Sequence, residues 1–190
     1  MGFPKVLITG VPGVGKTTLV KNFASRIRGV KLTGFYTEEL RDEKGRSGFV
    51  LKTLDGQRQV EIATSSGKGK KGKRVGKYSV DVEAFESLAL PAIAYHAEYN
   101  LYVVDEIGPM ECMSRLFCET VKMLLKSDRV AVLATVAKGG HPFIRDLIRL
   151  PGLEVLELTG SGHEKMEDEL LIKFMSALVK PATPSAGQNQ

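Results

Sequence analysis

The chain has 190 residues, of which 43% are hydrophobic and 26% charged, and these values are typical of one soluble globular domain. Two cysteines are too few for a disulfide framework or a zinc site, and no apolar run is long enough for a membrane helix. The formal charge of +5 is largely carried by a Gly- and Lys-rich stretch at 68–77. We interpret this stretch as a solvated loop, because no aromatic residues stand between its lysines to stack on bases. We therefore expect a soluble intracellular protein that is located in the cytoplasm, although a nuclear location is also compatible with the sequence. We expect it to bind neither a membrane nor a nucleic acid.

The first predicted unit is a strand, a glycine-rich turn and a helix. The apolar run 6–8 lies between Pro4 and Gly10, which predicts a buried parallel strand. Apolar residues at helical spacing from 16 to 28 predict a helix that ends at Gly29. This order opens a βαβ unit.

The next stretch, about 33–80, predicts an antiparallel β-meander inserted into the α/β unit. Turn signals at 43–45 and 55–56 separate its strand-like runs, which lie at 35–37, 48–51 and 59–62. After it, Asp81 is the predicted N-cap of a helix that starts at Val82, and Pro91 is expected to end or kink this helix.

The second half alternates between strands and helices. Strands are predicted at 101–104, 130–134 and 153–158, and helices at 114–126, 142–150 and 163–179. We expect one α/β domain over residues 1–180, with a mostly parallel central sheet, and a disordered tail of Pro, Ala, Ser, Gly, Gln and Asn at 181–190.

A phosphate-binding loop follows the first strand. The residues from Gly10 to Thr17 match the pattern G-x-x-x-x-G-K-[ST] at each fixed position. Glycines let the backbone curl so that its N–H groups point at an anion, and the helix N-terminus adds to this attraction. Lys16 is predicted to reach the β- and γ-phosphates, and the Thr17 hydroxyl to bind Mg²⁺. The predicted nucleotide-binding residues are Gly10, Val11, Pro12, Gly13, Val14, Gly15, Lys16, Thr17 and Thr18.

Two acids follow the apolar run 101–104. Asp105 fits the Walker-B position, where a carboxylate holds Mg²⁺, and Glu106 is then placed to orient an attacking water. The alternative is that Glu106 caps the turn after the strand. The chain between the two motifs is long enough for intervening strands, which favours a three-layer, RecA-like P-loop fold with an additional strand between the Walker A and Walker B strands. Glu106 and Lys16 are the predicted catalytic residues.

Further site residues are weaker predictions. Thr135 follows the run 130–134, and a residue at that end of a parallel strand can sense the terminal phosphate or position the water, or be a plain strand residue. Arg145 is a candidate for neutralising phosphate charge. The other candidate cations are Lys138, Arg149, Arg41 and Arg46, and we interpret His141 and His163 as surface residues.

The motif residues carry a resemblance to a known family. The phosphate loop and the run from Asp105 to Glu111, Asp-Glu-Ile-Gly-Pro-Met-Glu, are similar to those of the small nucleoside-triphosphatases first known from thermophiles. The similarity extends over roughly residues 3–179. It implies slow Mg²⁺-dependent hydrolysis of several nucleoside triphosphates with a loose base preference. One difference is the segment 159–163, which stands where many relatives carry an Asn-Arg pair.

Two other functions compete with hydrolysis. The Gly-x-Pro-Gly-x-Gly-Lys loop is also used by nucleotide and nucleoside kinases, which transfer the phosphate to an acceptor. The basic stretch would suit a nucleotide-gated RNA-binding module. We expect nucleoside triphosphates as partners and a monomeric protein.

Overall fold

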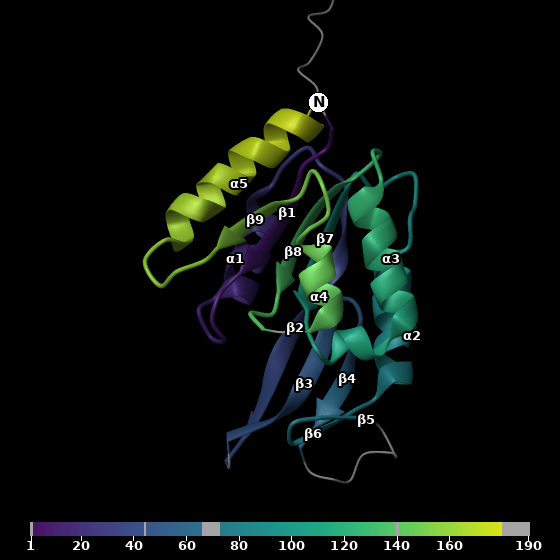
Figure 1. Cartoon of the computed structure of the whole chain (residues 1–190). Helices are drawn as coiled ribbons and strands as arrows, with labels where there is room; N and C mark the ends of the chain where they lie inside the picture. The colour runs from purple at the N-terminus through teal and green to yellow at the C-terminus, as the bar shows by residue number, and fades with distance from the viewer. Residues whose placement is uncertain (1, 44, 66–72, 140, 180–190) are drawn as a thin grey trace, which may run out of the picture.

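The structure, a computed structural model, describes residues 2–43, 45–65, 73–139 and 141–179 (Figure 1). Its strands form one nine-stranded sheet in the order β5-β6-β4-β3-β2-β7-β8-β1-β9. The predicted tail at 181–190 and the lysines at 68, 70 and 71 lie outside the described residues.

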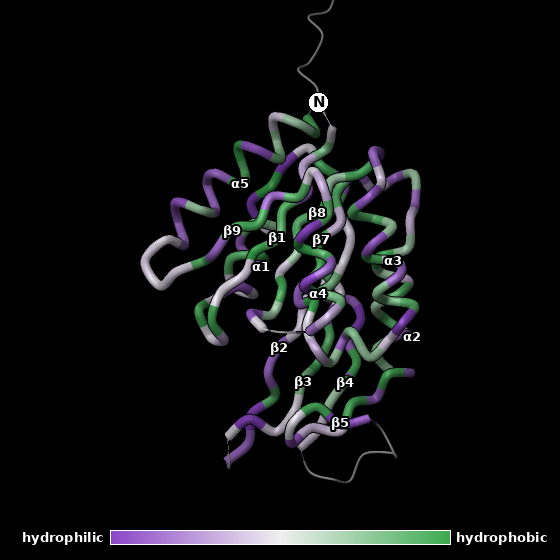
Figure 2. The backbone as a smooth tube through the Cα atoms, viewed as in Figure 1, coloured by the Kyte–Doolittle hydropathy of each residue, from purple (hydrophilic) through white to green (hydrophobic). Residues whose placement is uncertain are grey.

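One half of the sheet is parallel. It consists of β9 (Glu154–Glu157), β1 (Lys5–Thr9), β8 (Ala131–Val136), β7 (Leu101–Ile107) and the first part of β2 (Leu32–Asp42). Helices cover both faces of β1, β7 and β8, so these strands are apolar in consecutive residues, as predicted for buried parallel strands. Figure 2 shows the hydrophobic residues of these strands in the interior of the molecule. β8 pairs with both β1 and β7 and is therefore the additional strand expected between the two motif strands.

The other half of the sheet is antiparallel. It is made by the continuation of β2, by β3 (Gly45–Thr53) and β4 (Gln59–Thr64), and by a hairpin of β6 (Tyr78–Val80) and β5 (Lys73–Val75). The meander predicted at about 33–80 is thus an extension of the central sheet, because β2 pairs in parallel with β7 before it turns into β3. The β5–β6 hairpin was not predicted.

Helices lie on both faces of the parallel strands (Figure 1). α1 (Lys16–Arg26) and α5 (His163–Leu178) pack together on one face, and Phe23 and Phe174 meet edge to face with ring centres 5.2 Å apart. α2 (Val82–Ile93), α3 (Arg115–Lys126) and α4 (Pro142–Leu147) contribute to the core of the other face. A short 3₁₀ helix, η1 (Glu111–Met113), precedes α3. No helix within the described ranges is long and apolar enough to cross a membrane.

Three helices end at other residues than the sequence predicted. α1 ends at Arg26, because Ile27 is already extended, and Gly29 lies beyond the helix. α2 continues through Pro91 to Ile93, since a proline in the last turn removes only one helical N–H bond. α4 ends at Leu147, three residues before the predicted end, where the chain enters a turn.

Candidate nucleotide-binding site

The predicted phosphate loop joins the end of β1 to the start of α1 (Figure 1). Gly13 and Gly15 have φ angles of 78° and 99°, which side-chain-bearing residues rarely adopt. Gly15 is the N-cap of α1 and has no side chain with which to cap it. The first N–H groups of α1 are therefore open to an outside acceptor, and an anion at this point also gains from the helix dipole.

Asp105 lies at the centre of a hydrogen-bond network in the last part of β7. The Thr17 hydroxyl donates to Asp105 Oδ2 at 2.7 Å, the Thr135 hydroxyl donates to Oδ1 at 2.6 Å, and the Thr37 backbone N–H contributes a third bond. The side chain is fully buried, and burial raises the pKa of Asp105 although the three bonds oppose this effect. The bonds fix the orientation of a carboxylate directly against the Thr17 side chain of the phosphate loop.

Glu106 and Lys16 face each other beside this network. Lys16 Nζ lies 3.7 Å from Glu106 Oε1 and donates to the Gly10 carbonyl oxygen at 3.3 Å. The Glu106 side chain is 30% exposed, in contrast to the enclosed Asp105. Burial raises the pKa of Glu106, and the neighbouring Asp105 raises it further, while the Lys16 ammonium lowers it. A carboxylate that reaches solvent and has a raised pKa is suited to accept a proton from water.

A cavity of about 520 Å³ opens above these residues. One wall is the phosphate loop with the start of α1, and the opposite wall is the β2–β3 hairpin. The residues that line it are Pro12, Gly13, Gly15, Lys16, Thr17, Thr18, Lys21, Thr37, Glu38, Glu39, Arg41, Arg46, Phe49 and Glu106. The predicted loop residues Gly10, Val11 and Val14 are adjacent in the chain but do not line this cavity.

Thr135 is placed differently from its prediction. β8 runs on to Val136, so Thr135 lies inside the strand and is completely buried. Its hydroxyl donates to Asp105 and does not line the cavity. In this structure Thr135 therefore contacts Asp105 and not the cavity, and its role in sensing the terminal phosphate stays a prediction.

The cations predicted after β8 do not reach the cavity. Arg145 and Arg149 are exposed near α4 and absent from the lining, and Lys138 Nζ pairs with Glu157 at 2.5 Å. The two arginines that do line it, Arg41 and Arg46, come from the hairpin. The sequence carried no signal to prefer them, because the pairing of β2 beside β7 is what brings the hairpin to the phosphate loop.

Glu111 is a site residue that the motif analysis assigned no role. Its carboxylate accepts the Gly108 N–H at 3.1 Å and is buried close to both Asp105 and Glu106. A Cβ atom at Gly108 would lie 2.8 Å from Glu111 Oε2, so a larger residue there would require the carboxylate to shift. The bond closes the turn directly after the two acids. The available signal was the spacing of glycine and glutamate in the run from Asp105 to Glu111.

The donor set fits a magnesium ion. Mg²⁺ prefers oxygen ligands and is commonly held by one or two carboxylates together with substrate phosphates and waters. Asp105 and Thr17 supply one carboxylate and one hydroxyl next to the phosphate loop. No cluster of three His, Cys, Asp or Glu that would hold a metal by itself occurs among the described residues, so a metal here would take waters or phosphates as further ligands.

Comparison with known proteins agrees with this geometry. Residues 5–171 match the model of a protein family described as NTPase. The chain belongs to the NTPase family. It is 38% identical over 179 residues to the nucleoside-triphosphatase THEP1 of Aquifex aeolicus, covering 88% of this chain and 97% of that protein. It is 39% identical over 140 residues to the cancer-related nucleoside-triphosphatase of Homo sapiens, covering 69% and 74%.

A solved structure confirms the fold of this NTPase-family chain. The crystal structure of THEP1 from Aquifex aeolicus superimposes with a TM-score of 0.77 at 33% identity, covering 93% of this chain and 99% of that one. The α/β P-loop fold and the family resemblance predicted from the motifs are thereby confirmed.

The segment 159–163 of this NTPase-family chain leads into α5 beside the phosphate loop. A Cβ atom at Gly15 would lie 2.4 Å from Cε1 of His163, so the histidine ring packs against the loop. The interpretation of His163 as a surface residue was therefore wrong, and the ring is half-buried. The sequence carried no signal for this contact, because it depends on α5 packing beside α1 in the fold.

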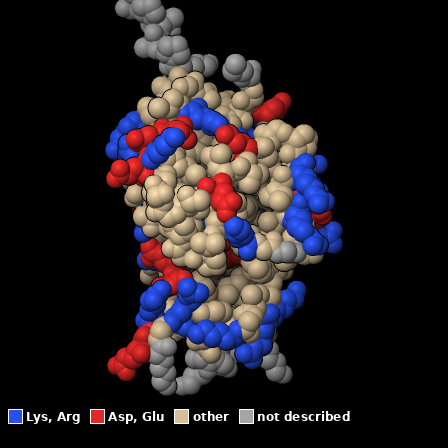
Figure 3. Space-filling view, turned by 60° about the vertical axis from the view of Figure 1, so that its left-hand side comes forward, with Lys and Arg blue, Asp and Glu red and all other residues tan. Residues whose placement is uncertain are grey.

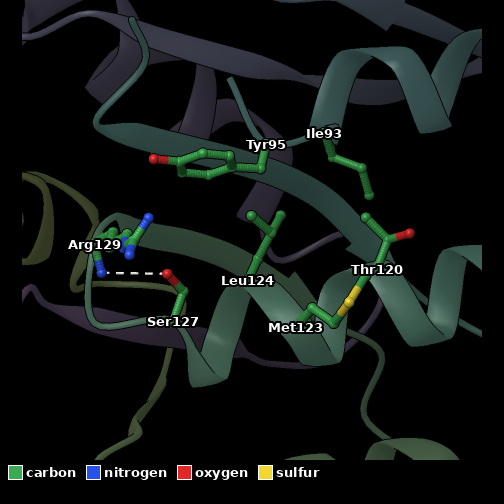
Figure 4. A pocket seen from close by; sticks show the side chains of 7 residues that line it. All are labelled: Ile93, Tyr95, Thr120, Met123, Leu124, Ser127 and Arg129. Carbon is green, nitrogen blue, oxygen red and sulfur yellow. Dashed lines mark hydrogen bonds between the residues drawn. The ribbon is translucent and has the colours of Figure 1, made fainter. Parts of the chain in front are cut away.

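A second hollow, of about 280 Å³, lies away from these residues (Figure 4). It is lined by Ile93, Tyr95, Thr120, Met123, Leu124, Ser127 and Arg129. These residues lie at the end of α2, along α3 and before the first residue of β8, at the edge of the sheet opposite the phosphate loop. The hollow is mainly apolar and offers one cation, so it has little to attract a triphosphate.

Proposed function

We propose that this protein hydrolyses nucleoside 5′-triphosphates to diphosphate and phosphate with Mg²⁺ and with a loose preference for the base. The observation that carries the proposal is the ion pair of Lys16 and Glu106 in the cavity above the phosphate loop. Lys16 Nζ lies 3.7 Å from Glu106 Oε1. This pair supports the proposal, because an ammonium group can bind phosphates and a neighbouring carboxylate can accept a hydrogen bond from water. The family assignment supports the same reaction, because its curated members are named nucleoside-triphosphatases.

The phosphate loop binds the part that all these substrates share. The open N–H groups at the start of α1 donate hydrogen bonds to phosphate oxygens, and Lys16 exchanges its contacts with Gly10 and Glu106 for the β- and γ-phosphates. These contacts involve no base atoms, which is the reason to expect several nucleotides as substrates. Val11 is 53% exposed on the same loop and adds apolar surface next to the phosphate site.

Asp105 and Glu106 have different roles in hydrolysis. Asp105 and Thr17 are the residues that would hold Mg²⁺, and Thr135 keeps Asp105 in place. When bound, the ion neutralises phosphate charge and orients the γ-phosphate. Glu106 accepts a hydrogen bond from the attacking water and polarises it, because its carboxylate reaches the cavity and its raised pKa makes it a stronger base. Lys16 then stabilises the charge that develops on the transferred phosphoryl group.

A product assay tests this proposal. Pure protein is incubated with ATP, GTP, CTP or UTP in Mg²⁺ or in excess EDTA, and free phosphate and diphosphate are measured. We expect equal amounts of phosphate and diphosphate with Mg²⁺, and neither product with EDTA. The rates for the four nucleotides should lie within about tenfold of one another, because the protein contacts only the phosphates that they share. Lys16→Ala should lose turnover, while the exposed Lys126→Ala serves as its matched control.

Two results would contradict the proposal. The first is an absence of phosphate with all four nucleotides in Mg²⁺. The second is transfer of the γ-phosphate to an added nucleoside or monophosphate in place of its release, which would establish a kinase.

A further inference from the structure

The outer part of the β2–β3 hairpin forms the wall of the cavity that faces the phosphate loop. β2 pairs with β7 up to Phe35, opposite Val104, and then continues to Asp42 with β3 as its only strand neighbour in the described part of the sheet. In this outer part Arg41 lies directly across from Arg46. Both arginines line the cavity that also contains Lys16 and Glu106.

The two carboxylates of the hairpin that line the cavity, Glu38 and Glu39, each pair with two cations. Glu39 accepts from Arg41 Nη2 at 2.7 Å and also from Arg46 Nη2. Glu38 accepts from Lys21 Nζ at 2.6 Å and pairs with Lys52 Nζ at 2.7 Å. Two cations and one carboxylate give each of these groups a net positive charge, and such a surface suits an anionic ligand. In Figure 3, Lys and Arg side chains gather over the lower end of the molecule, where the hairpins lie.

The two arginines differ in how firmly they are placed. Arg41 is 69% exposed, whereas Arg46 is 39% exposed and its guanidinium carbon lies 5.8 Å from the centre of the Phe49 ring. Arg46 Nε is buried and finds no hydrogen-bond acceptor among the residues that the structure describes. A buried donor without a partner is costly, and a phosphate oxygen that entered the cavity would satisfy it.

We propose that Arg46 is a catalytic residue that binds an oxygen of the terminal phosphate during hydrolysis, an arginine finger supplied by the same chain. This role rests on the proposed function. In the free protein Glu39 holds the guanidinium at the rim of the cavity. With substrate bound, the guanidinium exchanges Glu39 for the phosphate, which presents more charge and accepts two parallel N–H bonds. It then stabilises charge that builds up on the phosphoryl oxygens in the transition state.

The role is tested by kcat and KM for Mg-ATP and by the Kd for Mg-ADP, which lacks the terminal phosphate. We expect Arg46→Ala to lower kcat by about 100-fold or more, and to change the Kd for ADP by less than about threefold. Arg46→Lys should recover little, because an ammonium lacks the planar fork. Glu39→Gln should lower the KM for ATP, since it removes a carboxylate that competes with the phosphate for Arg46.

The outcomes separate this role from a plain ion pair on the hairpin. If Arg46 only held Glu39 in place, Arg46→Lys would have the parental kcat. In that case Glu39→Gln would also lower kcat as much as Arg46→Ala does. This pattern would overturn the catalytic role of Arg46. A kcat for Arg46→Ala within about threefold of the parent would also overturn it. The exposed Arg74→Ala on β5 is the control and should match the parent. Melting curves of each variant show that a lost activity is not lost folding.

Failure of this inference is distinguishable from failure of the proposed function. If the parent releases no phosphate from any nucleotide, the proposed function itself is wrong. If the parent is active and Glu106→Gln is not, while Arg46→Ala retains full turnover, then hydrolysis stands and only the role of Arg46 fails.

Discussion

Neighbouring residues in the motif run from Asp105 to Glu111 differ in what surrounds them, and this separates their roles. Asp105 is enclosed and has three hydrogen-bond donors, so the orientation of its carboxylate is fixed. Glu106 lies next to it and reaches the cavity, so it can contact a water. Glu111 is buried again and holds the turn at Gly108. The sequence identified the acids, and burial shows that Glu106 is the one that reaches the cavity.

The buried Glu111 predicts a pH dependence of stability. Burial raises the pKa of Glu111 to about 8, and the charges of Glu106 and Asp105 add to this effect. In the unfolded chain the group titrates near its ordinary value of about 4.5. The folded state therefore binds more protons between these two values, and its free energy of unfolding falls as the pH rises from about 4.5 to about 8, by at most about 5 kcal/mol at 1.4 kcal/mol per unit.

The measurement compares Glu111→Gln with the parent in urea unfolding, without nucleotide or metal. The glutamine oxygen can still accept the Gly108 N–H, but it cannot ionise. We expect the variant to gain stability relative to the parent as the pH rises from 5 to 8. The exposed Glu61→Gln on β4 is the control. A difference between Glu111→Gln and the parent that does not change with pH would refute the assignment.

At the scale of elements, capping fixes where the helices behind the site begin. Ser114 is the N-cap of α3: its hydroxyl oxygen accepts the Phe117 N–H at 3.0 Å, and its hydroxyl donates to Glu86 Oε1 on α2 at 2.6 Å. Ser114 is buried, so neither bond can be replaced by water easily. This one side chain therefore couples the start of α3 to α2.

Ser114→Ala should lower the free energy of unfolding by about 1–2 kcal/mol, because it removes the cap and leaves buried groups without a partner. Chemical denaturation measures the loss. Ser87→Ala, an exposed site in the middle of α2, is the matched control and should change little. Equal stability of the two variants would show that the cap contributes nothing.

Elements with a strong local pattern were predicted well, and those that depend on distant partners were not. The cap Asp81 and the apolar runs of β1, β7 and β8 carry their own signals. The β5–β6 hairpin does not, because its three-residue strands are polar or mixed and form only by pairing with β4. Pro91 was expected to end or kink α2, but the helix runs on to Ile93.

At the scale of the whole molecule, the sheet order brings the site together. β1, β8 and β7 lie side by side and end at the same edge, so the phosphate loop, Thr135 and Asp105 meet there. The motifs were sufficient to predict that the phosphate loop and Asp105 lie together, but not that Thr135 bonds to Asp105. The cavity wall with Arg41 and Arg46 was not predictable. No local sequence pattern indicates that β2 pairs with β7, and this pairing is what brings the hairpin to the phosphate loop.

The central claim is that the Glu106 carboxylate, next to the bound phosphates, activates a water molecule. Turnover by Glu106→Gln tests this claim most directly. At saturating Mg-ATP we expect phosphate release to fall by about 100-fold or more, while the Kd for Mg-ATP stays within about threefold of the parent, since the loop contacts remain. The exposed Glu83→Gln on α2 should be unchanged. Release of phosphate by Glu106→Gln at the parental rate would contradict the account.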